Sequence, residues 1–151
     1  VTIVDDREKY SNNIRFPEAV NTLVVDFQEA FNCVEVTSST FLLIVTRGHE
    51  YDELLLERAM RTPAKYIGMI GSKRKVLKAY EHLMENGVPV EQLQRVHAPV
   101  GIDLGAVTAE EIAVSIVAQL INVRRKGRAA IHDKSIDATE LLHRVEQRPV
   151  T

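Results

Sequence analysis

Residues 65–75 read KYIGMIGSKRK, an apolar run that ends at Gly71 and continues into Ser72 and three consecutive cations. The run predicts a buried strand, and the following VLKAYEHLMENG predicts a helix with one apolar face. The cations therefore fall in the first turn of a helix, where the macrodipole disfavours each of them by about 0.3–1 kcal/mol. The free N–H groups of such a helix start suit a bound phosphate, and Gly71 is expected to permit the tight turn into it. The alternative is a solvated basic face.

Strand-like and helical segments alternate along the rest of the chain. The other strand-like segments are VTIVDD (1–6), TLVVD (22–26), TFLLIVT (40–46) and RVHAPVG (95–101). Helical patterns cover residues 26–34, 50–62, 72–87 and 108–127. This alternation predicts an α/β fold, a Rossmann-like parallel sheet with helices on both faces. Within it, the wholly apolar strand 40–46 is expected to be buried on both faces, and helix 108–127, apolar around most of its circumference, to be well buried.

The composition is that of an ordinary globular domain. The chain has 151 residues, of which 45% are apolar and 26% charged, and a net charge of −2. This balance argues against a nucleic-acid or membrane-surface binder, since such proteins usually carry a basic excess. Without a membrane-spanning run or a signal peptide, a cytoplasmic location is expected. Cys33, the only cysteine, is expected to lie in the core, and it leaves no internal disulfide or Cys-rich metal site.

Residues suited to ligand binding follow several predicted strands, and ligands of open parallel sheets bind at the carboxyl ends of strands. Asp5 and Asp6 end the first strand, where an acid of a dinucleotide-binding fold accepts hydrogen bonds from ribose hydroxyls. NAD(P) is therefore one candidate cofactor, and the alternative is that these acids merely end a strand in a loop. The other segments at such ends are 46–50, 71–74 and 101–105.

Two histidines lie near these ends. His49 is followed by Glu50, and a His beside a carboxylate can transfer protons, although most such histidines are structural. His97, before Ala98, is equally ambiguous. The spacing of His49, Glu50 and Asp52 is no specific metal-ligand pattern. The sequence therefore assigns no catalytic residue and no metal ligand.

Three long segments carry a resemblance to a known family: IVTRGHEYD (44–52), KYIGMIGSKRK (65–75) and HAPVGIDLGAVTAEEIAVSI (97–116). In their identity and order they resemble the Rossmann-like C-terminal domain of the XdhC/CoxI family, the xanthine dehydrogenase accessory proteins. The resemblance covers roughly residues 1–126. It implies binding of molybdenum cofactor, whose pterin carries a phosphate, and delivery to the apoenzyme of a molybdenum hydroxylase. The positions expected to line the cleft are Arg47, Gly48, His49, Gly71, Ser72, Lys73, Arg74, Asp103 and Gly105.

Two other classes of function stay open. An NAD(P)-binding oxidoreductase or nucleotide sensor would share the fold and Asp5 and Asp6. A pure interaction module for the target enzyme would leave the cleft vestigial. The cofactor-handling function implies no turnover by this domain, since no nucleophile–base pair is found in the sequence.

The chain also departs from the family pattern at its start. Residues 1–6 open directly in a strand without Met, so a fragment is expected, with the Rossmann-like domain spanning residues 1–127 and a tail with a short helix spanning 128–151. In the strand order 3-2-1-4-5-6, segments 1–6 and 40–46 flank the first strand. If that strand is absent here, a strand from a missing N-terminal segment or from another copy of the chain, as in a homo-oligomer, is expected to fill the gap.

Overall fold

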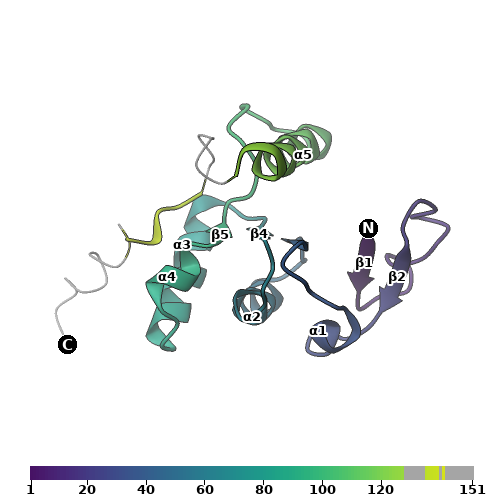
Figure 1. The fold of residues 1–151 in the computed structure, drawn as a ribbon, viewed down its shortest axis with the longest axis horizontal. Helices are drawn as coiled ribbons and strands as arrows, with labels where there is room; N and C mark the ends of the chain where they lie inside the picture. The colour runs from purple at the N-terminus through teal and green to yellow at the C-terminus, as the bar shows by residue number, and fades with distance from the viewer. Residues whose placement is uncertain (128–134, 140, 142–151) are drawn as a thin grey trace. The chain divides into compact units, whose positions relative to one another are not determined.

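The computed structural model describes residues 1–127, 135–139 and 141, without the side chains of residues 49 and 50 (Figure 1). The chain forms two compact units, Val1–Val36 and Thr37–Thr151. Most of the predicted tail, including Glu140, lies outside the described residues. Within it, Ala138 and Leu141 are helical, and the N–H of Thr139 donates to Asp137 Oδ1 at 2.8 Å, as expected of a helix start.

The first unit is a small parallel sheet with a single helical turn. Strands β1 (Thr2–Asp5) and β2 (Asn21–Val24) pair in register from Thr2 opposite Asn21 to Asp5 opposite Val24. The expected helix over 26–34 shortens to α1 (Ala30–Cys33). Only Ala30 of this turn is buried and Cys33 is exposed, so the prediction of a core cysteine is wrong.

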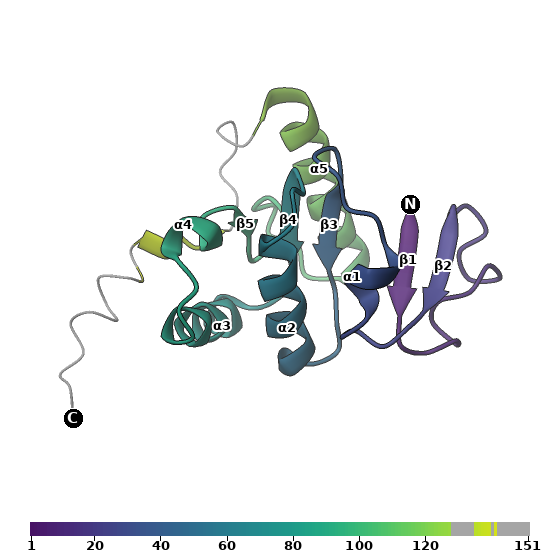
Figure 2. The same cartoon turned by 60° about the horizontal axis from the view of Figure 1, so that its bottom comes forward.

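The second unit holds a three-stranded parallel sheet in the order β3-β4-β5, formed by Phe41–Ile44, Tyr66–Met69 and Val96–His97. Its helices are α2 (His49–Met60), α3 (Lys73–Glu85), α4 (Val90–Leu93) and α5 (Ala109–Lys126). Figure 2 shows α2 and α3 on one side of these strands and α5 on the other. The predicted α/β architecture with a parallel sheet is therefore confirmed, and the short α4 is an element that the sequence analysis missed.

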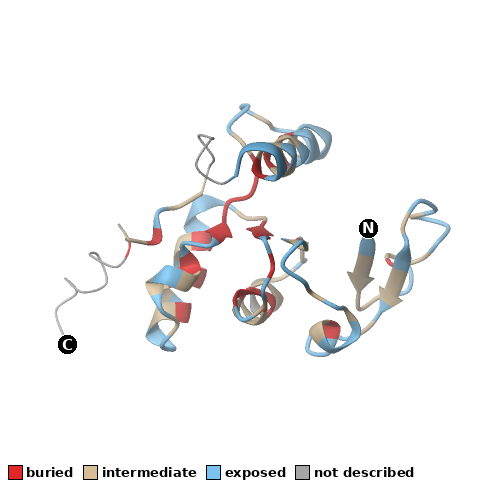
Figure 3. Ribbon diagram, viewed as in Figure 1, coloured by how far each residue is buried: buried red, intermediate tan, exposed pale blue. Residues whose placement is uncertain are grey.

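The core of the second unit lies on both faces of this sheet, and Figure 3 shows buried residues concentrated on β4, β5 and the inner sides of the helices. On the α5 side, Tyr66 and Val100 pack with Ile116 and Val123. A capping box explains where α5 begins: Thr108 accepts from the N–H of Glu111, whose carboxylate accepts from the N–H of Thr108. These two hydrogen bonds, each from a backbone N–H to a side-chain oxygen, also fix the direction in which the chain enters the helix.

Burial was overestimated for two elements. In and after β3, Leu43 is 43% exposed and Val45 58%, so the expectation of a strand buried on both faces is wrong. On α5, Val114, Val117 and Ile121 are at least half exposed, so this helix is not buried around its circumference. Both expectations assumed that apolar character implies a covering neighbour, and in the described part of the chain no such neighbour lies over these side chains.

The pairing of the strands agrees with the predicted strand order. If β1 is counted as the second strand, the pairs β1–β2 and β3–β4–β5 are the neighbours required by the order 3-2-1-4-5-6. Among the described residues, β1 pairs with β2 alone and β3 with β4 alone. The ladder between Ile3 and residues 42–45, which would contradict a missing strand, is therefore not formed. That a further strand pairs there stays a prediction.

A buried hydrogen-bonded cluster ties β4, β5 and α5 together. The rings of Phe41 and Tyr66 stack with centroids 5.4 Å apart, and those of Tyr66 and His97 with centroids 4.7 Å apart. Gln119 Oε1 accepts from the hydroxyl of Tyr66 at 2.7 Å and from the N–H of Gly101 at 2.8 Å. His97 is 3% exposed, so it belongs to the core of the domain.

Arg95 fastens the end of α2 to the segment before β4. Its guanidinium donates to three carbonyl oxygens, of Met60 at 2.9 Å and of Thr62 and Ala64 at 3.2 Å. The last carbonyls of a helix lack hydrogen-bond donors within the helix. A cation that donates to them supplies these hydrogen bonds and is also attracted by the negative end of the helix dipole.

We expect Arg95→Ala to lower the free energy of unfolding by about 1–3 kcal/mol, since these hydrogen bonds involve a charged donor. Chemical denaturation of the wild-type and variant chains measures the difference. Arg61→Ala is the matched control, because exposed Arg61 pairs with Glu57, one helical turn before it, and such pairs contribute about 0.3–0.5 kcal/mol. Equal losses of stability in the two variants would contradict a stabilising role for the hydrogen bonds of Arg95.

Candidate functional site at the carboxyl ends of the strands

The connections that follow β3, β4 and β5 lie at one edge of the sheet of the second unit. The three strands are parallel, so their carboxyl ends point to the same edge. The segments that leave this edge contain the predicted residues from Arg47 to Gly105. The sheet therefore brings together the predicted positions of the second unit at the level of their backbone connections.

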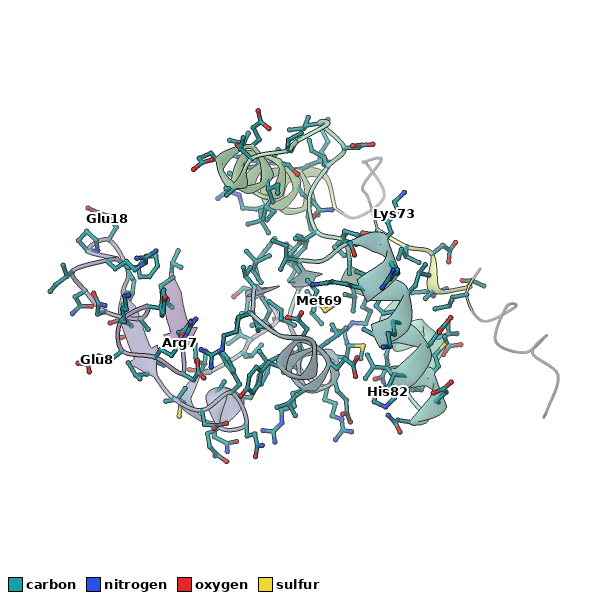
Figure 4. The ribbon with its side chains drawn as sticks, turned by 180° about the vertical axis from the view of Figure 1, so that it is seen from behind. Arg7, Glu8, Glu18, Met69, Lys73 and His82 are labelled. Carbon is teal, nitrogen blue, oxygen red and sulfur yellow. The ribbon has the colours of Figure 1, made fainter. Side chains whose placement is uncertain are left out.

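The start of α3 has the predicted cation-rich geometry. Ser72 is the N-cap, and its hydroxyl accepts from the N–H of Lys75 at 3.3 Å. Figure 4 shows the Lys73 side chain at the start of α3. Lys73 and Arg74 are both exposed, and the first turn contains no acid. Gly71 is not in the left-handed region, and a Cβ there would make ordinary contacts of 3.4 Å and more. Gly71 thus permits the turn into α3, but the backbone at this position does not require glycine.

The connection from β3 to α2 presents an exposed cation beside a local hydrogen-bond cluster. The hydroxyl of Thr46 lies 2.5 Å from Asp52 Oδ1 and 3.0 Å from the carbonyl oxygen of Gly48. Gly48 is the extended N-cap of α2, and Arg47 is exposed, with its guanidinium carbon 6.0 Å from the ring centre of Tyr51. His49 begins α2 by its backbone, and its side chain lies outside the described residues. Thr46 and Asp52 set the shape of this connection and were not among the predicted site residues.

The connection after β5 bends sharply at two glycines. Gly105 has φ +68°, and its N–H lies 3.4 Å from Oδ1 of the exposed Asp103. Gly101 has φ +103°, and a Cβ there would lie 2.2 Å from Ser115 Oγ. The Ser115 hydroxyl donates to the carbonyl oxygen of Ile102 at 3.0 Å. Gly101 and Ser115 thus position this connection, and the only sequence signal for them was a glycine just after a strand.

Asp5 and Asp6 belong to the first unit, at the carboxyl end of β1. Asp5 Oδ1 accepts from Arg7 Nε at 2.8 Å and from the Arg7 N–H at 3.0 Å, while Oδ2 accepts from Nη2 at 3.1 Å. The hydrogen bonds from the Arg7 side chain are the main cause that lowers the pKa of Asp5. In turn, the hydrogen bonds to Asp5 are the main cause that raises the pKa of Arg7. Asp6 Oδ1 lies 3.4 Å from Arg7 Nε. The two acids were predicted from the sequence, but Arg7 was not predicted as their partner.

The described residues contain no group of three or more His, Cys, Asp or Glu side chains that could hold a metal ion. They also contain no helix with the length and apolar character needed to cross a bilayer. The polar groups that the described residues place at the strand ends of the second unit are backbone N–H groups, the Ser72 hydroxyl, the cations of Arg47, Lys73 and Arg74 and the carboxylate of Asp103.

Residues 1–120 match the profile of the XdhC Rossmann domain. The chain belongs to this family. Membership confirms the resemblance seen in the three sequence segments, and it agrees with the parallel sheets and helices described above.

Three proteins are similar to this XdhC domain, and the two from Bacillus species carry names linked to xanthine dehydrogenase. The chain is 31% identical over 125 residues to the uncharacterized protein YqeB of Escherichia coli and 25% identical over 126 residues to a probable xanthine dehydrogenase subunit of Bacillus subtilis. These matches cover 82% and 83% of the chain. The crystal structure of a xanthine dehydrogenase from Bacillus halodurans matches 85% of it, with a TM-score of 0.70 and 30% identity.

The XdhC domain described here is much shorter than these proteins. The match covers 23% of the Escherichia coli relative and 36% of each of the two Bacillus proteins. What the longer proteins bind or do as a whole is therefore a property of chains that extend well beyond this domain.

Proposed function

We propose that this chain is the molybdenum cofactor-binding domain of an accessory protein that matures a xanthine dehydrogenase-type molybdenum hydroxylase. The observation that carries the proposal is the start of α3, where Lys73, Arg74 and Lys75 occupy the first turn without an acid. Each cation there is unfavourable for the helix by itself. A bound phosphate outweighs this cost, because it attracts both the cations and the positive end of the helix dipole.

The residues present fit the phosphate of the pterin. The N–H groups at a helix start point outward and bind phosphate oxygens, while Lys73 and Arg74 add charge-assisted hydrogen bonds. The molybdenum ion itself would favour a soft thiolate. The connections that follow β3, β4 and β5 contain no cysteine, so we give the metal no ligand here.

The other positions at this edge serve to hold the rest of the cofactor. Arg47 offers an exposed cation next to the N-cap glycine of α2, and Asp103 offers a carboxylate beside Gly105. We assign these residues, with His49, to binding and not to catalysis. The domain would hold and release its cofactor without turnover of its own.

The partner in this proposal is the apoenzyme of a molybdenum hydroxylase, and the names of the Bacillus relatives support it. A second partner would cover the edge of β3, which in the described residues pairs only with β4 and exposes Leu43 and Val45. Parallel pairing by a strand from another segment of the protein or from a second copy would satisfy the backbone groups of this edge, and the side chains of that strand would partly cover Leu43 and Val45. A homo-oligomer is one form of this arrangement.

The experiment is a titration of the purified chain with molybdenum cofactor released from a molybdenum hydroxylase, and separately with NAD and NADP. We expect saturable binding of the cofactor, competition by pyrophosphate, and activation of cofactor-free hydroxylase by the loaded chain. The competing function, an NAD(P)-dependent oxidoreductase or nucleotide sensor, draws on Asp5 and Asp6 alone. Reduction of a small substrate by the pure chain with NAD(P)H, without any cofactor binding, would overturn the proposal.

A further inference from the structure

Helix α5 carries a row of exposed apolar side chains that the proposed function does not use. Val114 is 62% exposed, Val117 52% and Ile121 50%, and we call these three residues the α5 stripe. Covering a side chain of this size contributes about 1.5–3 kcal/mol. Single exposed apolar residues are common on protein surfaces, but three in a row along one helix mark a surface for a partner.

The α5 stripe lies on the side of the helix that is turned away from the sheet. Successive residues of a helix are about 100° apart around its axis, so the stripe falls roughly opposite the core-facing residues of α5 (Figure 3). Those core-facing residues are Ile112, Ile116, Leu120 and Val123. An element that lay on the sheet beside α5 would not cover the stripe, so a partner must approach from the outer side of the helix.

The spacing of the α5 stripe fits a second helix. Val114, Val117 and Ile121 follow one another at intervals of three and then four residues, the spacing by which two helices pack along a narrow seam. α5 is already held in place by its packing on Tyr66, so pairing with another helix carries no cost of forming α5 itself.

The charges at the two ends of α5 indicate which helix this is. The first turn holds Glu110 and Glu111, and the last turn holds Arg124, Arg125 and Lys126. Glu110 and Arg125 are both exposed, one at each end of the stripe. In an antiparallel pair of identical helices, the acidic turn of one copy meets the basic turn of the other at both ends, whereas a parallel pair would oppose like charges. α5 is therefore complementary to itself in one orientation.

We propose that α5 packs antiparallel against α5 of a second copy of this chain, about a two-fold axis near Val117. Such an interface uses the same patch on both copies, so each contact occurs twice. It is separate from the edge of β3 and contains none of the residues assigned to the cofactor. The proposal therefore stands whether or not the chain binds molybdenum cofactor.

The length of α5 sets the strength of this dimer. A helix of 18 residues is about 27 Å long, and two such helices side by side bury less than the roughly 1,200–2,000 Å² of a typical stable interface. We therefore expect a dimer with a Kd in the micromolar range, which dissociates on dilution.

Sedimentation velocity of the purified chain over a micromolar concentration series tests the proposal. The mass should rise from that of one chain to that of two, and Val117→Glu should weaken the dimer about 100-fold or more, because it places two charges at the centre of the apolar seam. Circular dichroism of this variant verifies that the fold is retained. Ile14→Glu is the matched control, at an apolar residue of the first unit that is 96% exposed, and should dimerise as the wild type does. A chain that stays monomeric, with the stripe left for another segment of a longer protein or for the apoenzyme, would overturn the proposal.

Charge exchange tests the orientation of the two helices. Glu110→Arg or Arg125→Glu alone should raise the Kd about tenfold, because like charges then meet at both ends of the pair. The double variant Glu110→Arg/Arg125→Glu restores opposite charges and should return the Kd to the wild-type value. Val45→Glu, beside the edge of β3, should leave the dimer intact. An unchanged Kd in both single variants, or a dimer that is lost in Val45→Glu and kept in Val117→Glu, would refute the pairing of α5.

Discussion

Replacement of Gln119 by Leu is expected to lower the free energy of unfolding by about 2–5 kcal/mol, one of the largest effects available in this chain. Gln119 is fully buried, and its Oε1 accepts from two buried donors, the Tyr66 hydroxyl and the Gly101 N–H. Leu fills a similar volume but accepts no hydrogen bond. Both donors would then lose this acceptor, at a cost of about 1–3 kcal/mol each.

Denaturant unfolding measures this loss, and a double-mutant cycle locates it. Tyr66→Phe removes one of the donors, so Gln119→Leu should cost less in the Tyr66→Phe background than in the wild type. The control is Gln94→Leu, because Gln94 is an exposed glutamine that donates to Thr139 at 2.7 Å. If Gln119→Leu proved as mild as Gln94→Leu, the cluster would not be a source of stability.

The double variant Lys73→Ala/Arg74→Ala is expected to weaken binding of molybdenum cofactor about 100-fold or more, since each charge-assisted hydrogen bond contributes about 1.5–3 kcal/mol. The same variant should leave the free energy of unfolding unchanged or raise it by about 0.3–1 kcal/mol per cation removed. Calorimetric titration and denaturant unfolding of the same samples measure the two quantities. Opposite changes in affinity and stability are the signature of cations retained for a ligand.

Arg124→Ala/Arg125→Ala is the matched control for this variant. These arginines lie in the last turn of α5, where the helix dipole favours cations. Their removal should lower stability slightly and leave the affinity for the cofactor intact. Undiminished affinity in Lys73→Ala/Arg74→Ala would reject the phosphate site at α3.

The sequence was sufficient to predict the elements around residues 65–75. An apolar run ends at Gly71 and Ser72, and the apolar residues that follow recur every 3.6 positions, which predicts a strand followed by a helix. In the structure α3 begins at Lys73 with Ser72 as its N-cap. The candidate positions of the second unit could be assigned to one edge because parallel strands all end there. These are local or topological properties, so a single sequence contains them.

Properties that depend on which neighbour covers a residue could not be predicted in this way. Leu43 and Val114 have the character of core residues and yet are exposed. The role of Gln119 depends on Tyr66 and Gly101, which are 53 and 18 positions away. The pairing of Arg7 with Asp5 is close in sequence, but any neighbouring acid could have served as its partner.

The small first unit has one further consequence, for how it responds to ligands. Its described residues include only three that are buried, Ser11, Phe27 and Ala30. Two strands with so little buried surface are marginally stable by themselves, so this unit should be the first part of the chain to open in native-state hydrogen exchange. Any partner that binds only the folded form of this unit adds RT ln(1 + [L]/Kd) to the free energy that keeps it folded. The concentration of such a partner would then set how much of the time residues 1–36 are folded, and hydrogen exchange of this unit would report on its binding.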